Sequence, residues 1–155
     1  MDLSKLLPIE SCLVELDSPG INECLTALAQ PLVDSGVVTD LKKFQQDLIE
    51  REEQVTTIIC DKVAIPHARS SAVTRLSLVV GVHKEDQPCN FTTDETDRPV
   101  QLFFLIAIPE LMPTSHMPLL KHIALLLKQN RRTQKLLRTT KSKDLHKYLL
   151  AFTGK

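Results

Sequence analysis

The sequence predicts an α/β fold, a single domain over residues 1–155 with a central mixed β-sheet flanked by helices. Short apolar runs rich in β-branched residues alternate along the chain with longer segments whose apolar residues repeat at helical spacing. Two of the apolar runs are nearly continuous, which is typical of strands covered on both faces. A chain of this length is sufficient to fill one hydrophobic core.

The amino-terminal part is predicted to hold one strand and two amphipathic helices. Residues 12–16 alternate weakly and end at turn-forming residues, which indicates a strand. Apolar side chains at offsets 0, 3, 4, 7 and 11 form one helical face over residues 21–32, and Gly36 ends this element. Asp40 suits the N-cap of a second helix over residues 41–53. We expect both helices to cover one face of the sheet.

The middle of the chain is predicted to supply the other strands. Residues 55–60 and 63–65 should pair as a hairpin that leads directly into Pro66 and His67. Two strongly apolar strands are expected at residues 76–82 and 100–108, with a polar loop or short irregular edge at residues 88–98.

The carboxyl-terminal part changes to helical periodicity. Ser115 can cap a helix that continues to Leu127 and places His116 on its buried face. Residues 133–139 indicate a short basic helix, and Ser142 is expected to cap a last helix.

Composition indicates a cytoplasmic globular protein. An apolar content of 43% and a charged content of 25% lie in the ordinary globular range, and no apolar run is long enough to span a bilayer. The amino terminus lacks the basic and apolar regions of a signal peptide. The cysteines have no zinc or redox spacing, so we expect free thiols in a reducing compartment. These are Cys12, Cys24, Cys60 and Cys89.

Charge is distributed unevenly although the formal net charge is zero. Residues 121–155 carry a formal +9 and residues 1–60 carry −7. A basic end can bind nucleic acid, but here no aromatic residues are interleaved for base stacking, because Tyr148 and Phe152 fit an apolar helix face. A solvated helix surface is therefore the favoured interpretation of the basic end, and nucleic-acid binding remains a separate hypothesis for the protein.

Two of the five histidines are candidates for chemistry. His67 and His116 are both expected at ends of the sheet, where α/β folds assemble sites. His116 and His122 differ by a rotation of roughly 240° on a helix, which argues against a metal pair. His83 and His146 stand beside charged residues, so we expect them on the surface. From spacing alone, an ordinary surface or turn position remains the favoured interpretation of His67.

The stretch 51–69, REEQVTTIICDKVAIPHAR, resembles the phosphorylation-site region of the type-2 enzyme IIA family of the bacterial phosphoenolpyruvate-dependent phosphotransferase system. This is the fructose, mannitol and nitrogen-regulatory class. The AIPH element is its most specific part. An apolar strand ending in proline and a Ser-His helix start extend the resemblance over nearly the whole chain.

The resemblance implies an enzyme IIA fold and a phosphotransferase role. It implies that His67 accepts phosphate from the histidine phosphocarrier protein and that His116 and Arg51 match the second histidine and the arginine of the family site. Arg51 could bind phosphoryl oxygens, and backbone N–H groups with Ser70 and Ser71 could donate further hydrogen bonds. No cofactor or metal is expected. The structural alternatives are a surface salt bridge with Glu52 or another acidic neighbour for Arg51, and a hydrogen bond at the core edge for His116.

The hairpin differs from the family in lacking glycine. Positions that are usually glycine are Ile58, Cys60, Lys62 and Ala68. This motivates an alternative hypothesis, a regulatory binding module of the same fold that takes no phosphate. Cys60 is interpreted as a packed strand residue, with a redox-sensitive thiol as the alternative. Since no fused transport or IIB segment is present, the nitrogen-regulatory branch is favoured, with a regulatory target or a IIB component as partner.

Overall fold

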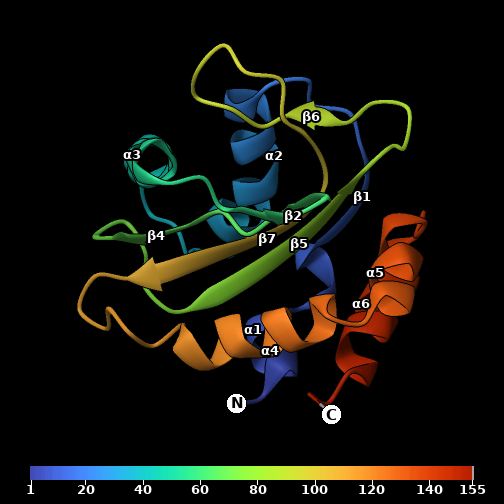
Figure 1. The fold of residues 1–155 in the computed structure, drawn as a ribbon. Helices are drawn as coiled ribbons and strands as arrows, with labels where there is room; N and C mark the ends of the chain where they lie inside the picture. The colour runs from blue at the N-terminus through green and yellow to red at the C-terminus, as the bar shows by residue number, and fades with distance from the viewer. Residues whose placement is uncertain (155) are drawn as a thin grey trace.

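The computed structural model describes residues 1–154, which form one mixed seven-stranded sheet between two layers of helices (Figure 1). The central strand is β7 (Pro99–Pro109), which pairs antiparallel with β5 (Ser77–His83) and parallel with β3 (Lys62–Ala64) and β4 (His67–Ser70). The outer strands are β1 (Cys12–Leu16) beside β5, β2 (Ile58–Cys60) beside β3, and β6 (Cys89–Asn90) beside β7. The predicted fold class is confirmed.

The helices cover both faces of this sheet. On one face lie α2 (Ile21–Asp34) and α3 (Leu41–Gln54), as Figure 1 shows. The other face is covered by α1 (Leu3–Leu6), a 3-10 turn η1 (Ile9–Ser11), α4 (Met117–Leu127), α5 (Asn130–Leu137) and α6 (Ser142–Ala151).

Alternation along β7 divides the core into two parts. Phe103 and Leu105 pack with the α2 and α3 layer, whereas Leu102, Phe104 and Ile106 pack with α4, α5 and α6. Each of these side chains is almost fully buried, which stabilises the fold by roughly 1.5–3 kcal/mol per side chain before entropic costs. The continuous apolar run of β7 thus follows from having a helix layer on each face.

Of the three predicted N-caps, Asp40 is confirmed, whereas Ser115 and Ser142 are wrong, because His116 and Lys141 hold the N-cap positions of α4 and α6. The Asp40 carboxylate accepts a hydrogen bond from the Lys43 N–H at 3.1 Å and caps α3 as expected. Ser115 does not cap α4, because its hydroxyl donates to the Met112 carbonyl at 2.8 Å and His116 holds the N-cap position. The cap is therefore displaced by one residue.

The predicted hairpin is present, but its first strand is shorter than predicted and its second strand begins and ends one residue earlier. Ile58 pairs with Ala64, and Cys60 pairs with Val63 across an irregular register. Lys62 has a φ of 66°, in the left-handed region that glycine adopts without steric cost. The tight turn therefore forms without glycine, with a lysine in a conformation that favours glycine.

Candidate functional site

Strand β4 brings His67 to the end of the sheet nearest the start of α4. Successive residues of a strand point to opposite sides, so His67 and Arg69 point outward while Ala68 and Ser70 are buried. Pairing of His67 with Ile106 fixes β4 against the central strand, and the Ile106 N–H also donates to the Pro66 carbonyl at 2.9 Å. The imidazole is thus mounted on the rigid part of the sheet.

A backbone contact selects one tautomer of His67. Its Nδ1 lies 2.8 Å from the Ile65 carbonyl oxygen. A carbonyl can only accept, so Nδ1 carries the hydrogen and Nε2 carries the free lone pair. Nε2 is consequently the nucleophilic nitrogen of this half-buried ring.

The surroundings favour the neutral form of His67. Burial is the largest cause that lowers its pKa below the ordinary 6.5, and the charges of Arg51 and Arg69 act in the same direction. The hydrogen bond to Ile65 and the charge of Glu52 oppose this shift without reversing it. A neutral imidazole with a free Nε2 lone pair is the form that attacks phosphorus.

His116 lies beside His67, as the sequence predicted from their strand-end positions. The ring centroids are 5.9 Å apart and the planes are tilted by 31°. His116 is buried, and within residues 1–154 its Nδ1 has no hydrogen-bond partner. Burial first, then the neighbouring His67 and Arg69, lowers the pKa of His116. The alternative that His116 makes a hydrogen bond at the edge of the core is therefore not supported for its Nδ1.

Arg69 is a site residue that the sequence reasoning missed. Its Nε donates to the Pro113 carbonyl at 2.7 Å, which ties β4 to the loop before α4, and its charge acts on both histidines. No strand is predicted from the sequence at residues 67–70, and it is this strand, β4, that places Arg69 two positions after His67 on the same face.

Arg51 lies in the last turn of α3. Its Nη1 donates to the Val55 carbonyl at 2.8 Å, and its charge lowers the pKa of His67. The expected alternative of an ion pair with Glu52 is wrong. The buried Glu52 carboxylate instead accepts from the N–H and the hydroxyl of Thr57, at 2.7 and 2.6 Å. This pair fixes the connection between α3 and the hairpin.

Neither Ser70 nor Ser71 lies on the face of β4 that carries His67. Ser70 is buried on the inward side of β4, where its hydroxyl accepts from the Ala72 N–H at 3.1 Å. Ser71 is exposed in the following turn. The structure therefore gathers His67, His116 and the two arginines, and leaves Ser70 on the opposite side of the strand.

Two side chains lie elsewhere than the sequence indicated. His83 is buried at the end of β5, not on the surface, because the strand continues one residue beyond its predicted end. Cys60 lies at the end of β2 with its side chain exposed, so the interpretation as a packed strand residue is wrong. Partial desolvation and the charge of Asp61 raise the pKa of the Cys60 thiol, which reduces its thiolate content.

Two cations of the basic carboxyl-terminal helices make cation–π contacts with aromatic rings of the same region. The Lys135 ammonium lies 3.9 Å from the centroid of the Tyr148 ring, and the Arg132 guanidinium lies 5.2 Å from that of Phe152. In a nucleic-acid site, aromatic rings of this kind would stack on bases. Here the rings of Tyr148 and Phe152 are covered by cations of the same chain.

Comparison with known proteins is consistent with this geometry. A family model described as phosphoenolpyruvate-dependent sugar phosphotransferase system, EIIA 2, matches residues 5–151. The fructose-specific EIIA component of Haloferax volcanii is 30% identical over 128 residues, covering 79% of this chain and 78% of that protein.

Solved structures show the same fold. The nitrogen regulatory protein IIA-Ntr of Neisseria meningitidis superposes with a TM-score of 0.78 at 21% identity, covering 94% of this chain and 97% of that one. The mannitol enzyme IIA of Escherichia coli, in complex with its phosphorylated enzyme IIB, superposes with a TM-score of 0.73 at 18% identity, covering 90% and 94%.

Proposed function

Because this chain belongs to the EIIA 2 family of the phosphoenolpyruvate-dependent sugar phosphotransferase system, we propose that it accepts a phosphoryl group on Nε2 of His67. The observation that carries the proposal is the hydrogen bond from Nδ1 to the Ile65 carbonyl, which leaves Nε2 as the free base. The lowered pKa of His67 keeps this base neutral at pH 7.

The donor is a phosphohistidine on the histidine phosphocarrier protein. The His67 Nε2 lone pair attacks phosphorus, the P–N bond of the donor breaks, and its electron pair returns to the donor imidazole. No metal is needed in this step, since positioning and charge compensation supply the catalysis. The new phosphoramidate on His67 is transferred onward to a IIB component or controls a regulatory target.

Charge compensation is assigned to three side chains. Arg51 and Arg69 act electrostatically on His67, so they can offset the negative charge of the phosphoryl oxygens. His116 is neutral because its pKa is lowered, and it keeps one ring N–H that can donate to a phosphoryl oxygen. Backbone N–H groups and Ser71 are further candidate donors. The inward hydroxyl of Ser70 is assigned to supporting the turn at Ala72.

Exposed apolar side chains near the site suit the docking of a partner protein. Leu111, Met112 and Met117 lie in the loop and first turn around His116 and are 95%, 60% and 54% exposed. On the other side, Val55 and Ile59 are 67% and 50% exposed, next to Arg51 and the hairpin. Apolar residues around a polar centre are typical of protein interaction surfaces.

Phosphotransfer with purified donor components tests the proposal. Wild type incubated with phosphoenolpyruvate, enzyme I and the histidine phosphocarrier protein should gain one acid-labile, base-stable phosphoryl group by intact mass. His67→Ala should gain none. His146→Gln is the matched control, because its amide can keep the 3.0 Å contact with the Leu7 carbonyl, and it should label like wild type. Equal labelling of wild type and His67→Ala would refute the assignment.

The strained hairpin favours one alternative, a regulatory module of the same fold that takes no phosphate. Lys62 is not glycine but occupies a left-handed conformation, which glycine adopts without steric cost. Under this alternative, wild type stays unlabelled with every phosphorylated donor while a partner still binds. The same mass measurement therefore separates the two functions.

A further inference from the structure

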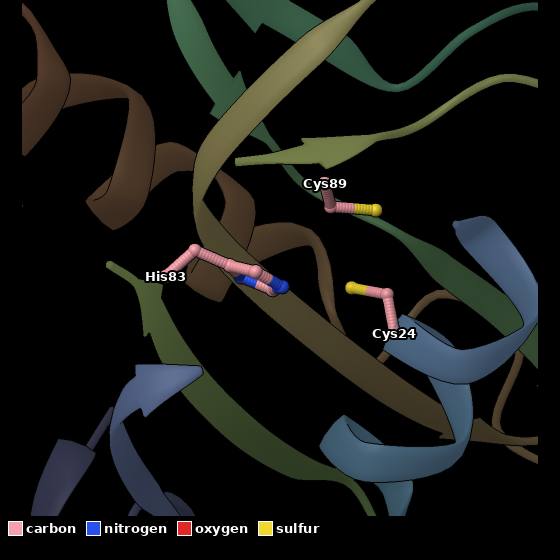
Figure 2. Close-up of side chains that lie close together, drawn as sticks. All are labelled: Cys24, His83 and Cys89. Carbon is pink, nitrogen blue, oxygen red and sulfur yellow. The ribbon is translucent and has the colours of Figure 1, made fainter. Parts of the chain in front are cut away.

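Three buried side chains far from His67 converge on one point. Cys24 in the first turns of α2, His83 at the end of β5 and Cys89 in β6 point toward one another (Figure 2). One ligand atom of each lies within 4.8 Å of those of the other two. Their side chains are 0%, 1% and 0% exposed. The cluster lies apart from the histidines of the proposed phosphoryl site.

The imidazole of His83 presents an unused nitrogen to the two sulfurs. Its Nε2 lies 3.2 Å from the Ser18 carbonyl oxygen, so Nε2 carries the hydrogen and Nδ1 carries the lone pair. Within residues 1–154 this buried Nδ1 has no hydrogen-bond partner. Buried polar atoms are nearly always paired, so the free Nδ1 lone pair of a buried ring that lies beside two thiols is available to a ligand.

We propose that Cys24, His83 and Cys89 form a binding site for a soft, thiophilic metal ion, Zn²⁺ or Cu⁺. Two thiolates and one imidazole are the donor set that such ions prefer over Mg²⁺ or Ca²⁺. The carbonyl of Ser18 orients the imidazole from the outer side, as in protein metal sites generally.

The spacing of the ligand atoms suits such an ion. Metal–sulfur bonds of about 2.3 Å place neighbouring ligand atoms about 4 Å apart, so a contraction of under about 1 Å closes the site. No fourth His, Cys, Asp or Glu within residues 1–154 belongs to the group. Cu⁺ is satisfied by the three ligands, whereas Zn²⁺ takes a water or a backbone carbonyl as its fourth.

Metal binding replaces two thiol protons. Burial first, then a hydrogen bond with Cys89, raises the pKa of Cys24 well above its ordinary value, so Cys24 is a thiol in the metal-free protein. The incoming ion forms two metal–sulfur bonds and one metal–nitrogen bond, and both thiol protons pass to solvent. Access is through the exposed segments on each side of the two-residue strand β6, at positions 85–88 and 93–97.

The bound ion would join three segments that are distant in sequence. It ties the start of α2 to the end of β5 and to β6. Without the ion, β6 is held by two paired positions on β7, by a bridge between Asn90 and Gly20, and by the hydrogen bond from the Asn90 N–H to the Pro19 carbonyl at 2.9 Å. An ion that binds the folded chain and not the unfolded one raises stability by mass action. The site is therefore assigned a structural role.

Metal uptake by the full-length chain tests the proposal. Protein reduced and stripped with a chelator is loaded with Zn²⁺ in one arm and with Cu⁺, supplied as a soluble complex, in the other. After removal of unbound metal, the metal content and the midpoint of thermal unfolding are measured. We expect stoichiometric uptake of one of the two ions and a higher midpoint. Absence of uptake in both arms would overturn the proposal.

Variants separate this cluster from adventitious binding. Cys24→Ser with Cys89→Ser should abolish uptake, whereas Cys60→Ser, which removes the exposed thiol, should retain it. His83→Gln keeps an N–H near Ser18 and removes the Nδ1 ligand. It should weaken binding by more than the roughly 10- to 100-fold that loss of an outer partner costs. Thermal unfolding of the metal-free variants checks that they fold.

Several outcomes of these measurements would contradict a metal site at Cys24, His83 and Cys89. Uptake that survives the double serine substitution, or that is lost in Cys60→Ser, would place the metal elsewhere. If the double variant fails to fold, unchanged affinity in His83→Gln contradicts the site by itself. Formation of a Cys24–Cys89 disulfide on treatment with peroxide, in a protein that takes up neither ion when reduced, would identify the pair as a redox couple instead.

Discussion

The Nδ1 atom of His67 lies 2.8 Å from the carbonyl oxygen of Ile65, two residues before it and across Pro66. This contact uses one ring nitrogen and leaves the other free. Proline fixes its own φ and restricts the residue before it to extended backbone, so the segment that carries this carbonyl is stiff. The orientation of the imidazole is therefore built into the Ile-Pro-His sequence itself.

The neutral state of His67 gives a prediction for pH dependence. Its pKa is lowered by burial and by Arg51 and Arg69, so protonation should have its midpoint below pH 6.5. Phosphoryl acceptance should fall as the ring is protonated and reach half of its maximum at that midpoint, because only the neutral ring has a free lone pair. NMR titration of the ring, assigned by comparison with His67→Ala, measures the midpoint directly. A midpoint above 6.5 would contradict the electrostatic account.

Arg69 is predicted to act on both histidines. Arg69→Gln removes a positive charge that disfavours protonation, so the pKa values of His67 and His116 should both rise. The phosphotransfer rate should fall by about 10²-fold, as for loss of one transition-state donor.

Two further variants separate charge from geometry in this prediction. Arg69→Lys keeps the charge but lacks the Nε group that donates to the Pro113 carbonyl, so the histidine titrations should stay near wild type while transfer still slows. Arg75→Gln removes an exposed cation elsewhere and should change neither property. Unchanged titration and transfer in Arg69→Gln would exclude Arg69 from the site.

The larger elements and the pairing of the two histidines could be predicted from the sequence. The apolar run of β7 and the Asp40 cap are local signals, because periodicity and capping depend on neighbours in the chain. His67 and His116 could be placed together because each is adjacent to the end of a predicted element. Both predictions agree with the structure.

The Cys24, His83 and Cys89 cluster could not be predicted in this way. Cys24 and Cys89 belong to elements brought together only by the tertiary fold, and no fixed spacing connects them. The charged residues that follow His83, beginning with Lys84, predict an exposed histidine, yet β5 ends at His83 and not before it. A difference of one residue in the end of β5 therefore determines whether His83 is expected on the surface or in the core.

Leu111 is predicted to serve partner docking and not folding. With 95% of its surface exposed, Leu111→Ser should change the free energy of unfolding by less than about 0.5 kcal/mol. Transfer should slow at limiting donor concentration and recover at saturating donor, because only the encounter is weakened. Ile9→Ser, at an exposed position in η1, is the control and should leave transfer unchanged. Equal effects of the two substitutions would show that the loop takes no part in docking.

The backbone at Lys62 predicts that glycine stabilises the hairpin. A non-glycine residue in the left-handed region costs roughly 1–2 kcal/mol, whereas glycine costs about 0.5–1 kcal/mol through the greater entropy of the unfolded chain. Lys62→Gly should therefore raise the free energy of unfolding by about 0.5 kcal/mol in denaturant titrations. Asp61→Gly, one residue away without a positive φ, should lower it by a similar amount. If Lys62→Gly also speeds phosphorylation of His67, the lysine limits the hairpin's fit to the donor, and an unchanged rate would confine its effect to stability.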